Sequence, residues 1–260
     1  MSIRIITFNL RCDSARQDGD NHFTKRLPLI VEAMASGQPD VMCLQEVTPT
    51  MLAALTQALP DHAFYGHSRG GDYLQDEANP IAIRADRLNL HALDTCWLSP
   101  APRQPASRHA QQSSCPRILT WVRLLDKPSG MVFTVVNTHL DHVSHQAKAA
   151  GLAQALQCAA DHRAEHGCPV FLAGDFNFPP DNPLAAMWAA SACPMVDLTA
   201  GSGATYHGFG QAKSPVKIDY VLADADTAQA HEFTLTTWQK SRDGRYLSDH
   251  IALCIDWEFK

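Results

Sequence analysis

Short apolar runs, each bounded by turn-forming residues, dominate the chain and predict more strands than helices. The runs have the length and the β-branched or aromatic content that strands favour. The predicted strands are residues 2–9, 40–45, 80–84, 88–97, 117–125, 131–138, 169–173, 217–223, 231–238 and 250–258. Because these strands are short and do not alternate regularly with helices, the pattern favours a mixed-sheet α/β sandwich over a simple alternating βαβ fold.

Helical spacing of apolar residues occurs in fewer segments. In the first of them, Leu27, Ile30 and Met34 fall on one face, and Pro49 stands where a second helix begins. The predicted helices are residues 24–35, 50–59, 145–162 and 181–190. No internal repeat and no linker divides the chain, so we expect one α/β domain over residues 1–260.

Polar side chains follow the predicted strands at the points where these strands end. Gly174, Asp175, Phe176 and Asn177 come directly after the apolar stretch 169–173. Residues two apart in a strand point to the same side of the sheet, which places Asp175 and Asn177 together. Burial of an unpaired neutral polar group costs about 2–7 kcal/mol, and burial of a charge costs more. We therefore expect both side chains to face a site rather than the core.

Other predicted strands have the same design, because each carries a polar residue at an end or an edge. These further residues are Asn9, Glu46, His139, Asp219, Asp249 and His250. One strand with a polar end is common, whereas a whole set with this composition predicts a shared metal-binding, acid–base site.

The balance of charge limits the partners. The chain has 21 Lys and Arg against 27 Asp and Glu, a net charge of −6, and no basic run longer than Lys25-Arg26. A protein that holds long nucleic acid usually has a basic face and a high pI. The composition therefore counts against an extended basic nucleic-acid surface. It does not exclude a nuclease, because an acidic metal site contributes negative charge of its own.

Cysteine usage and hydropathy bear on the compartment. The eight cysteines form no C-x-x-C pair, and Cys43, Cys158 and Cys254 lie inside predicted apolar elements, as small core residues do. No stretch approaches the roughly 20 apolar residues that span a bilayer, and a predicted strand begins where a secretory signal would lie. We therefore expect a reduced, cytoplasmic protein without a membrane segment; export of a processed precursor is the alternative.

Several short motifs, each weak alone, are specific together. They are Asn9, Leu44-Gln45-Glu46, Asn137-Thr138-His139, Gly174-Asp175-Phe176-Asn177, Ile218-Asp219-Tyr220 and Ser248-Asp249-His250. In this order they resemble the endonuclease/exonuclease/phosphatase superfamily of deoxyribonuclease-like, metal-dependent phosphoesterases, over about residues 3–258. The resemblance implies a four-layered sandwich of two mixed β-sheets flanked by helices. The stretches around Arg117 and Tyr206 are most similar to an uncharacterised bacterial subfamily.

The oxygen-rich polar set favours a hard divalent cation. Mg²⁺ and Mn²⁺ prefer carboxylate and carboxamide oxygens, and the set has no cysteine cluster that would indicate structural zinc. We expect Glu46 to be the first ligand and Asp249 a second one, directly or through water. Asn9 is expected to support the metal or to bind a phosphate oxygen or the attacking water. The alternatives are a helix-capping role for Glu46 and a turn-forming role for Asn9.

Asp175 is the best candidate for the base that orients and deprotonates the attacking water, since a weak base suffices beside a cation-bound water. Asn177 would place the phosphate or that water. His139 and His250 are the expected phosphate-facing imidazoles, and a histidine that must stay protonated needs an acid behind it. The resemblance implies Asp219 as the partner of His250.

Two further candidates rest on the resemblance. Glu77, which precedes a predicted strand, is the implied partner of His139, as in deoxyribonuclease-like members; abasic-site enzymes lack this acid. Arg117 is the implied phosphate-binding arginine, because a guanidinium binds phosphate oxygens bidentately; a surface salt bridge is its alternative. The long loop 98–116 could be functional or merely mobile, and the segment 205–210 could be an aromatic rim or a plain turn.

The sequence thus predicts a divalent-metal-dependent hydrolase of phosphoester bonds. Water would attack phosphorus, with Asp175 as the base and with His139 and His250 stabilising the phosphate. The expected substrate is a small phosphodiester, a phosphomonoester, a nucleotide or a nucleic-acid end. A nonspecific DNA or RNA nuclease is the second hypothesis and a non-catalytic scaffold the third. The number of metal ions and the oligomeric state stay open.

Overall fold

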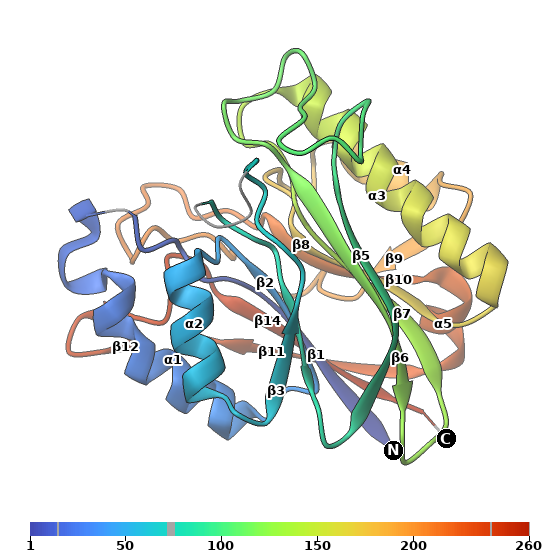
Figure 1. Ribbon diagram of the computed structural model, residues 1–260, viewed down its shortest axis with the longest axis horizontal. Coiled ribbons are helices and arrows are strands. Elements are labelled where there is room, and N and C mark those ends of the chain that lie inside the picture. The colour runs from blue at the N-terminus through green and yellow to red at the C-terminus, as the bar shows by residue number, and fades with distance from the viewer. Residues whose placement is uncertain (15, 72–75, 240, 260) are drawn as a thin grey trace.

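Two six-stranded β-sheets pack face to face, and helices cover their outer faces (Figure 1). The computed structural model describes residues 1–14, 16–71, 76–239 and 241–259. The layers are helix, sheet, sheet and helix, which confirms the predicted four-layered α/β sandwich. Among the described residues no helix is long and apolar enough to cross a membrane. The cysteines are all free thiols.

The first sheet consists of strands from both ends of the chain. They are β1 (Ser2–Asn9), β2 (Val41–Gln45), β3 (His62–Tyr65), β4 (Ile81–Arg84), β11 (Glu232–Trp238) and β14 (Ala252–Glu258). Their order is β11-β14-β1-β2-β4-β3; β1 and β2 run parallel, and the other neighbours run antiparallel. The helices α1 (Phe23–Gly37) and α2 (Pro49–Ala58) cover the outer face (Figure 1).

The second sheet comes from the middle of the chain. Its strands are β5 (Leu88–Trp97), β6 (Ile118–Asp126), β7 (Val132–His139), β8 (Val170–Asp175), β9 (Met195–Asp197) and β10 (Asp219–Asp224). Their order is β5-β6-β7-β8-β10-β9. Since β7 and β8 are parallel neighbours, a crossover must join them, and α3 (His145–His166) is that crossover. It starts at the N-cap Ser144 and ends at the left-handed Gly167.

The predicted strands and the three longer predicted helices are all present, with ends that differ by a few residues. The predicted helix 181–190 is a 3₁₀ turn followed by the short α4 (Ala186–Ala189). The elements that were not predicted are short, and neighbouring segments rather than their own pattern hold them in place. They are β3, β9, α5 (Ala225–Ala230), a 3₁₀ helix (Arg16–Asn21) and the hairpin of β12 (Ser241–Arg242) and β13 (Arg245–Tyr246).

Both faces of the central strands are buried, which explains why these strands have continuous apolar sequences. In β1, Ile3 and Ile5 point into the layer between the sheets, where they meet Trp257 of β14. Ile6 and Phe8 point to the other side, into the cluster beneath α1 and α2. A strand covered on both faces loses the alternation of apolar and polar residues that marks a half-exposed strand.

A buried pair of amides joins the two sheets at one end. Gln45, the last residue of β2, donates from Nε2 to Oδ1 of Asn137 in β7 over 2.7 Å. Asn137 Nδ2 lies 2.9 Å from the carbonyl oxygen of Leu44, 3.2 Å from that of Asn79 and 3.1 Å from that of Pro80. Both amide side chains are fully buried. Asn137 therefore connects the second sheet to β2 and to the segment that leads into β4.

Asn137→Ala should lower the free energy of unfolding by about 1–3 kcal/mol, because buried carbonyl groups and the Gln45 amide lose their partner. Urea denaturation followed by circular dichroism measures the change. Asn89→Ala is the matched control, since Asn89 is an exposed asparagine in β5, and it should change stability by no more than about 0.5 kcal/mol. Equal effects of the two substitutions would contradict the role given to Asn137.

Candidate active site

One end of the sandwich collects the polar ends of the strands. β1 and β2 run parallel, and so do β7 and β8, so within each pair the carboxyl ends point the same way. β10 is antiparallel to β8, and its first residue, Asp219, pairs with Asp175, the last residue of β8. The two sheets meet here, because Asn9 Nδ2 of β1 donates to Asp175 Oδ2 over 3.1 Å. The topology thus brings distant parts of the chain to one edge.

A cavity of about 390 Å³ opens at this end. Most of the predicted site residues line it, and the two that do not, Asn9 and Asp219, are hydrogen-bonded to residues that do. The predicted residues that line the cavity are Glu46, Glu77, Arg117, His139, Asp175, Asn177, Asp249 and His250. The structure therefore places the whole predicted set in one region.

Asp175 stands at the centre of this region and is 2% exposed. Its Oδ2 accepts a hydrogen bond from Asn9 and lies 3.5 Å from His139 Nε2 and 3.8 Å from His250 Nε2. Burial and the nearby charge of Asp219 raise the pKa of Asp175 to about 7, although His250 and Asn9 oppose the shift. A carboxylate with such a pKa can accept a proton near neutral pH, as a general base must.

His250 has the acidic partner that the resemblance implied. Its Nδ1 lies 2.9 Å from Oδ2 of Asp219, and both residues are buried. Burial disfavours the charged imidazole, but the charges of Asp219 and Asp175 outweigh this effect and raise the pKa of His250 to about 10. His250 is therefore positively charged at neutral pH. Tyr206 packs edge-on against its ring, with the ring centroids 5.2 Å apart.

His139 differs from the expectation that it stays protonated. Its side chain is almost fully buried, and its Nδ1 has no hydrogen-bond partner among the residues that the structure describes. Burial, followed by the positive charges of Arg117 and Arg69, lowers the pKa of His139 well below its ordinary value. The imidazole is thus neutral at neutral pH, and it can still donate one hydrogen bond.

Glu77 lines the cavity but is not paired with His139 as expected. Its Oε2 lies 2.9 Å from Nη1 of Arg69, whose Nε lies 2.9 Å from Oδ1 of Asp76. The expected pairing is wrong, because Arg69 neutralises Glu77 in its place. Arg69 lies in an irregular segment between β3 and β4, where no periodic pattern indicates a role.

Glu46 follows β2 in the left-handed conformation, with φ 60°. Asn9 Nδ2 donates to its Oε1 over 3.1 Å, and the backbone N–H of Cys12 donates to its Oε2 over 3.0 Å. Burial favours the neutral acid, but these hydrogen bonds outweigh burial and lower the pKa of Glu46. Asn9 Oδ1 accepts from the backbone N–H of Arg11 over 2.9 Å. Asn9 therefore orients Glu46 and Asp175, and because an amide oxygen has two lone pairs, the expected contact of this oxygen with a metal or a phosphate stays a prediction.

Asn177 does not continue the strand, so the expected same-face arrangement with Asp175 is wrong. β8 ends at Asp175, and Asn177 is left-handed, with φ 56°. Its backbone N–H donates to Asp175 Oδ1 over 2.9 Å, and its Nδ2 donates to the carbonyl oxygen of Leu140 over 3.1 Å. Asn177 thus holds the Asp175 carboxylate through its backbone and contributes to the cavity wall with its side chain.

Arg117 directly precedes β6 and is 4% exposed, so it does not form a surface salt bridge. Its Nη2 donates to Nδ1 of His142 over 2.9 Å, and its buried Nε has no hydrogen-bond partner in the described part of the chain. Cys115, at the end of the loop 98–116, also lines the cavity.

The segment 205–210 holds the backbone of Asp249 in place by hydrogen bonds. The backbone N–H groups of His207 and Gly208 donate to its carbonyl oxygen, and Ser248 Oγ donates to its Oδ1 over 3.2 Å. Its Oδ2 lies 3.9 Å from Nε of Arg11. Burial and the nearby charge of Glu46 raise the pKa of Asp249, while His250 and Arg11 oppose the shift.

Other lining residues were not among the predicted site residues, although Tyr206 belongs to the segment 205–210, for which an aromatic rim was one of two expectations. They are Arg11, Cys12, Arg69, Cys115, His142, Tyr206 and Ile218. In the sequence, closeness to a motif is the most that could have indicated any of these residues. Arg11 and Cys12 follow Asn9, and His142 follows His139.

The donor set fits a hard divalent cation. Glu46 and Asp249 offer carboxylate oxygens on the same cavity. An oxygen of Glu46 and one of Glu77 lie within 4.8 Å of each other. Arg69 offsets the charge of Glu77, and carboxylate oxygens are the ligands that Mg²⁺ and Mn²⁺ prefer.

The two packed six-stranded sheets with outer helices are the fold of the deoxyribonuclease-like phosphoesterases. The chain belongs to the Endonuclease/Exonuclease/phosphatase family, whose sequence profile matches residues 6–250. Enzymes of this family depend on divalent metals. A search of curated proteins gives no match.

Solved structures share the fold over nearly their whole lengths. An endonuclease/exonuclease/phosphatase from Bacteroides vulgatus is 25% identical, with all of both chains covered and a TM-score of 0.88. A mannosyl-6-phosphatase from Bacteroides thetaiotaomicron is 22% identical, with 99% of this chain and 100% of that chain covered and a TM-score of 0.84. TDP2 from D. rerio, complexed with a single-strand DNA product, is 18% identical, with 99% of each chain covered and a TM-score of 0.73.

Gly174→Ala should destabilise the protein and displace Asp175. Gly174 has φ 144°, and a Cβ there would lie 1.9 Å from the carbonyl oxygen of Thr138. The strained backbone and the clash should together cost about 2 kcal/mol or more, which thermal denaturation measures. Gly201→Ala is the control, because a Cβ at Gly201 meets no atom within 4 Å and its φ is not positive. The same melting temperature for both variants would show that position 174 tolerates a side chain.

Proposed function

We propose that this protein is a divalent-metal-dependent hydrolase in which water attacks the phosphorus of a small phosphorylated substrate. The observation that carries the proposal is the position of Asp175. Its carboxylate lies between the charged His250 and the neutral His139, and Asn9 connects it to Glu46. This arrangement supports a base that acts beside phosphate-binding groups and candidate metal ligands.

Asp175 would accept the proton of the attacking water, and the backbone N–H of Asn177 would keep its carboxylate in position. The charged His250, with Asp219 behind it, would stabilise the negative charge on the phosphate oxygens. His139 would contribute a hydrogen bond from a neutral imidazole rather than a second positive charge.

Arg117 would bind the phosphate oxygens that do not react. Arg117 lines the cavity, and its buried Nε, which has no partner among residues 1–14, 16–71, 76–239 and 241–259, supports a role in binding a ligand. Charge-assisted hydrogen bonds from arginine to phosphate are about twice as strong as neutral ones.

Glu46 and Asp249 would hold the metal, with Asn9 fixing the orientation of Glu46. When bound, Mg²⁺ or Mn²⁺ supplies a Lewis acid that neutralises the phosphate and polarises its oxygens. Glu77, paired with Arg69, would extend the acidic side of the cavity.

The cavity supports a small substrate: a phosphomonoester, a small phosphodiester, a nucleotide or a nucleic-acid end. A volume of about 390 Å³ is near the lower end for small-molecule sites. The net charge of −6 disfavours a long basic track for polymeric nucleic acid. A screen of phosphomonoesters, phosphodiesters, nucleotides and oligonucleotides with Mg²⁺ and with Mn²⁺ tests the proposal. No hydrolysis of any phosphoester with either metal would refute it, and cleavage of long DNA or RNA would favour the nuclease.

Asp175→Asn should lower kcat by at least about 100-fold, because general-base catalysis contributes about 10²- to 10⁴-fold. Steady-state hydrolysis of the best substrate from the screen measures the change. The matched control is Asp61→Asn, which removes an exposed acid between α2 and β3 and should leave kcat unchanged. An Asp175→Asn variant with wild-type kcat would show that another group is the base.

Arg117→Ala should raise KM by about 10- to 100-fold, because hydrogen bonds to charged groups contribute about 1.5–3 kcal/mol. The matched control is Arg242→Ala, in which an exposed arginine of β12 loses its ion pair with Glu32. If circular dichroism shows that Arg117→Ala is folded and its KM is unchanged, Arg117 does not bind the substrate.

A further inference from the structure

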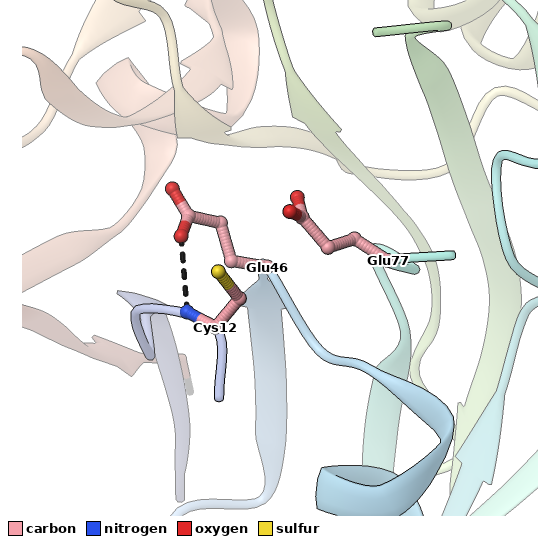
Figure 2. Close-up of side chains that lie close together, drawn as sticks. All are labelled: Cys12, Glu46 and Glu77. Carbon is pink, nitrogen blue, oxygen red and sulfur yellow. Dashed lines mark hydrogen bonds between the residues drawn. The ribbon is translucent and has the colours of Figure 1, made fainter. Parts of the chain in front are cut away.

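The cavity holds a thiol among its acids that the proposed hydrolysis does not use. The sulfur of Cys12, a carboxylate oxygen of Glu46 and one of Glu77 all lie within 4.8 Å of one another (Figure 2). Figure 2 shows the sulfur below the Glu46 side chain and the Glu77 side chain extending toward both. The three residues come from different segments: after β1, after β2 and before β4.

Each member of this cluster of Cys12, Glu46 and Glu77 is held by a further contact. The backbone N–H of Cys12 donates to Glu46 over 3.0 Å, and Arg69 holds Glu77 over 2.9 Å. The sulfur of Cys12 lies 3.0 Å from the hydroxyl oxygen of Ser14. That hydroxyl can donate to a thiolate, and such outer contacts orient metal ligands.

An independent observation indicates that the cavity receives a ligand. Arg117 and His139, which line it together with the cluster, are 4% and 5% exposed. Among the described residues, Nε of Arg117 and Nδ1 of His139 are buried nitrogens without a hydrogen-bond partner. Buried polar groups in native proteins are nearly always satisfied, and a guanidinium N–H needs an acceptor, so these atoms point to a bound group with acceptor atoms in the cavity that the cluster lines.

We infer that Cys12, Glu46 and Glu77 form a binding site for a thiophilic divalent cation such as Zn²⁺. With a Zn–S distance of about 2.3 Å and Zn–O distances of about 2.0–2.2 Å, the ligand atoms of a tetrahedral site lie about 3.4–3.6 Å apart. The ligand atoms of the cluster lie within 4.8 Å of one another, so side-chain rotations that bring them about 1 Å closer would complete the site. Coordination releases the thiol proton to solvent, and a sulfur electron pair binds the ion; no group is oxidised or reduced.

The thiol sets the selectivity of this site. Mg²⁺ is a hard cation that binds oxygen, whereas Zn²⁺ binds thiolate sulfur as well as carboxylate oxygen. Because the cluster shares Glu46 with the proposed catalytic metal, Zn²⁺ and Mg²⁺ should exclude each other. This exclusion is the only part of the inference that rests on the proposed function.

Cd²⁺ is the probe, because binding to a thiolate produces an ultraviolet charge-transfer band. Titration of the whole chain should produce the band with one equivalent of Cd²⁺. Cys12→Ser should lose the band and weaken Cd²⁺ binding by at least tenfold, which is about 1.4 kcal/mol. Glu77→Gln should weaken binding and keep the band. Cys115→Ser is the matched control, because Cys115 lines the same cavity outside the cluster, and it should keep both the band and the affinity.

A Cys12→Ser variant with the wild-type band and affinity would overturn the inference. A second measurement needs no variant. Zinc X-ray absorption of the wild-type protein with one equivalent of Zn²⁺ should show one sulfur ligand and otherwise light atoms, and a shell without sulfur would overturn the inference.

The cation site and the proposed hydrolase function can be refuted independently of each other. If no phosphoester is hydrolysed but the thiolate band forms through Cys12, the cation site stands and the proposed function fails. If hydrolysis occurs, Zn²⁺ should inhibit the Mg²⁺-dependent reaction of the wild-type protein at lower concentrations than that of Cys12→Ser. Equal inhibition of both proteins would argue against a shared Glu46.

Discussion

The buried contact between Gln45 and Asn137 is the constraint on which the rest of the site depends. Glu46 directly follows Gln45, and His139 lies two residues beyond Asn137 in the same strand. A shift of one sheet along the other would separate Glu46 from His139 and from Asp175. Because both amides are buried away from water, no solvent molecule can replace their hydrogen bonds in a shifted arrangement. The sheets therefore have one relative position, and the catalytic geometry follows from it.

Their buried surroundings give the two histidines of the cavity different protonation states. His139 and His250 approach the same oxygen of Asp175, at 3.5 Å and 3.8 Å. His250 has Asp219 behind it and is charged, whereas His139 has Arg117 beside it and is neutral. Water would screen the neighbouring charges and so reduce the difference between the two pKa values. In the buried wall of the cavity the screening is weak, and the difference remains large. One edge of the sandwich thus offers a cationic imidazole, a neutral imidazole and a carboxylate with a raised pKa within a few ångströms.

The predicted part of the structure depends on local pattern, and the unpredicted part depends on contacts between distant segments. Apolar runs with polar ends are visible in the sequence, so the strands and most of the cavity wall could be predicted. The pairing of Glu77 with Arg69 could not, because it forms only when an irregular segment folds back onto the cavity. The positive φ of Glu46 and Asn177 was also invisible, since few non-glycine residues adopt it. The neutral state of His139 depends on burial and on arginines that no motif includes.

The position of β14 has a consequence for the order in which the molecule is built. This strand lies between β1 and β11, and its register pairs Glu258 with Ser2. During synthesis β1 leaves the ribosome well before β14, so it gains this neighbour only after the strands between them in the sequence have emerged. Asp249 and His250 lie just before β14, separated from it by Ile251, so a carboxylate and the charged imidazole reach the cavity in that late step. Nascent chains therefore carry an incomplete centre, and such long-range pairing makes slow, late assembly the expectation.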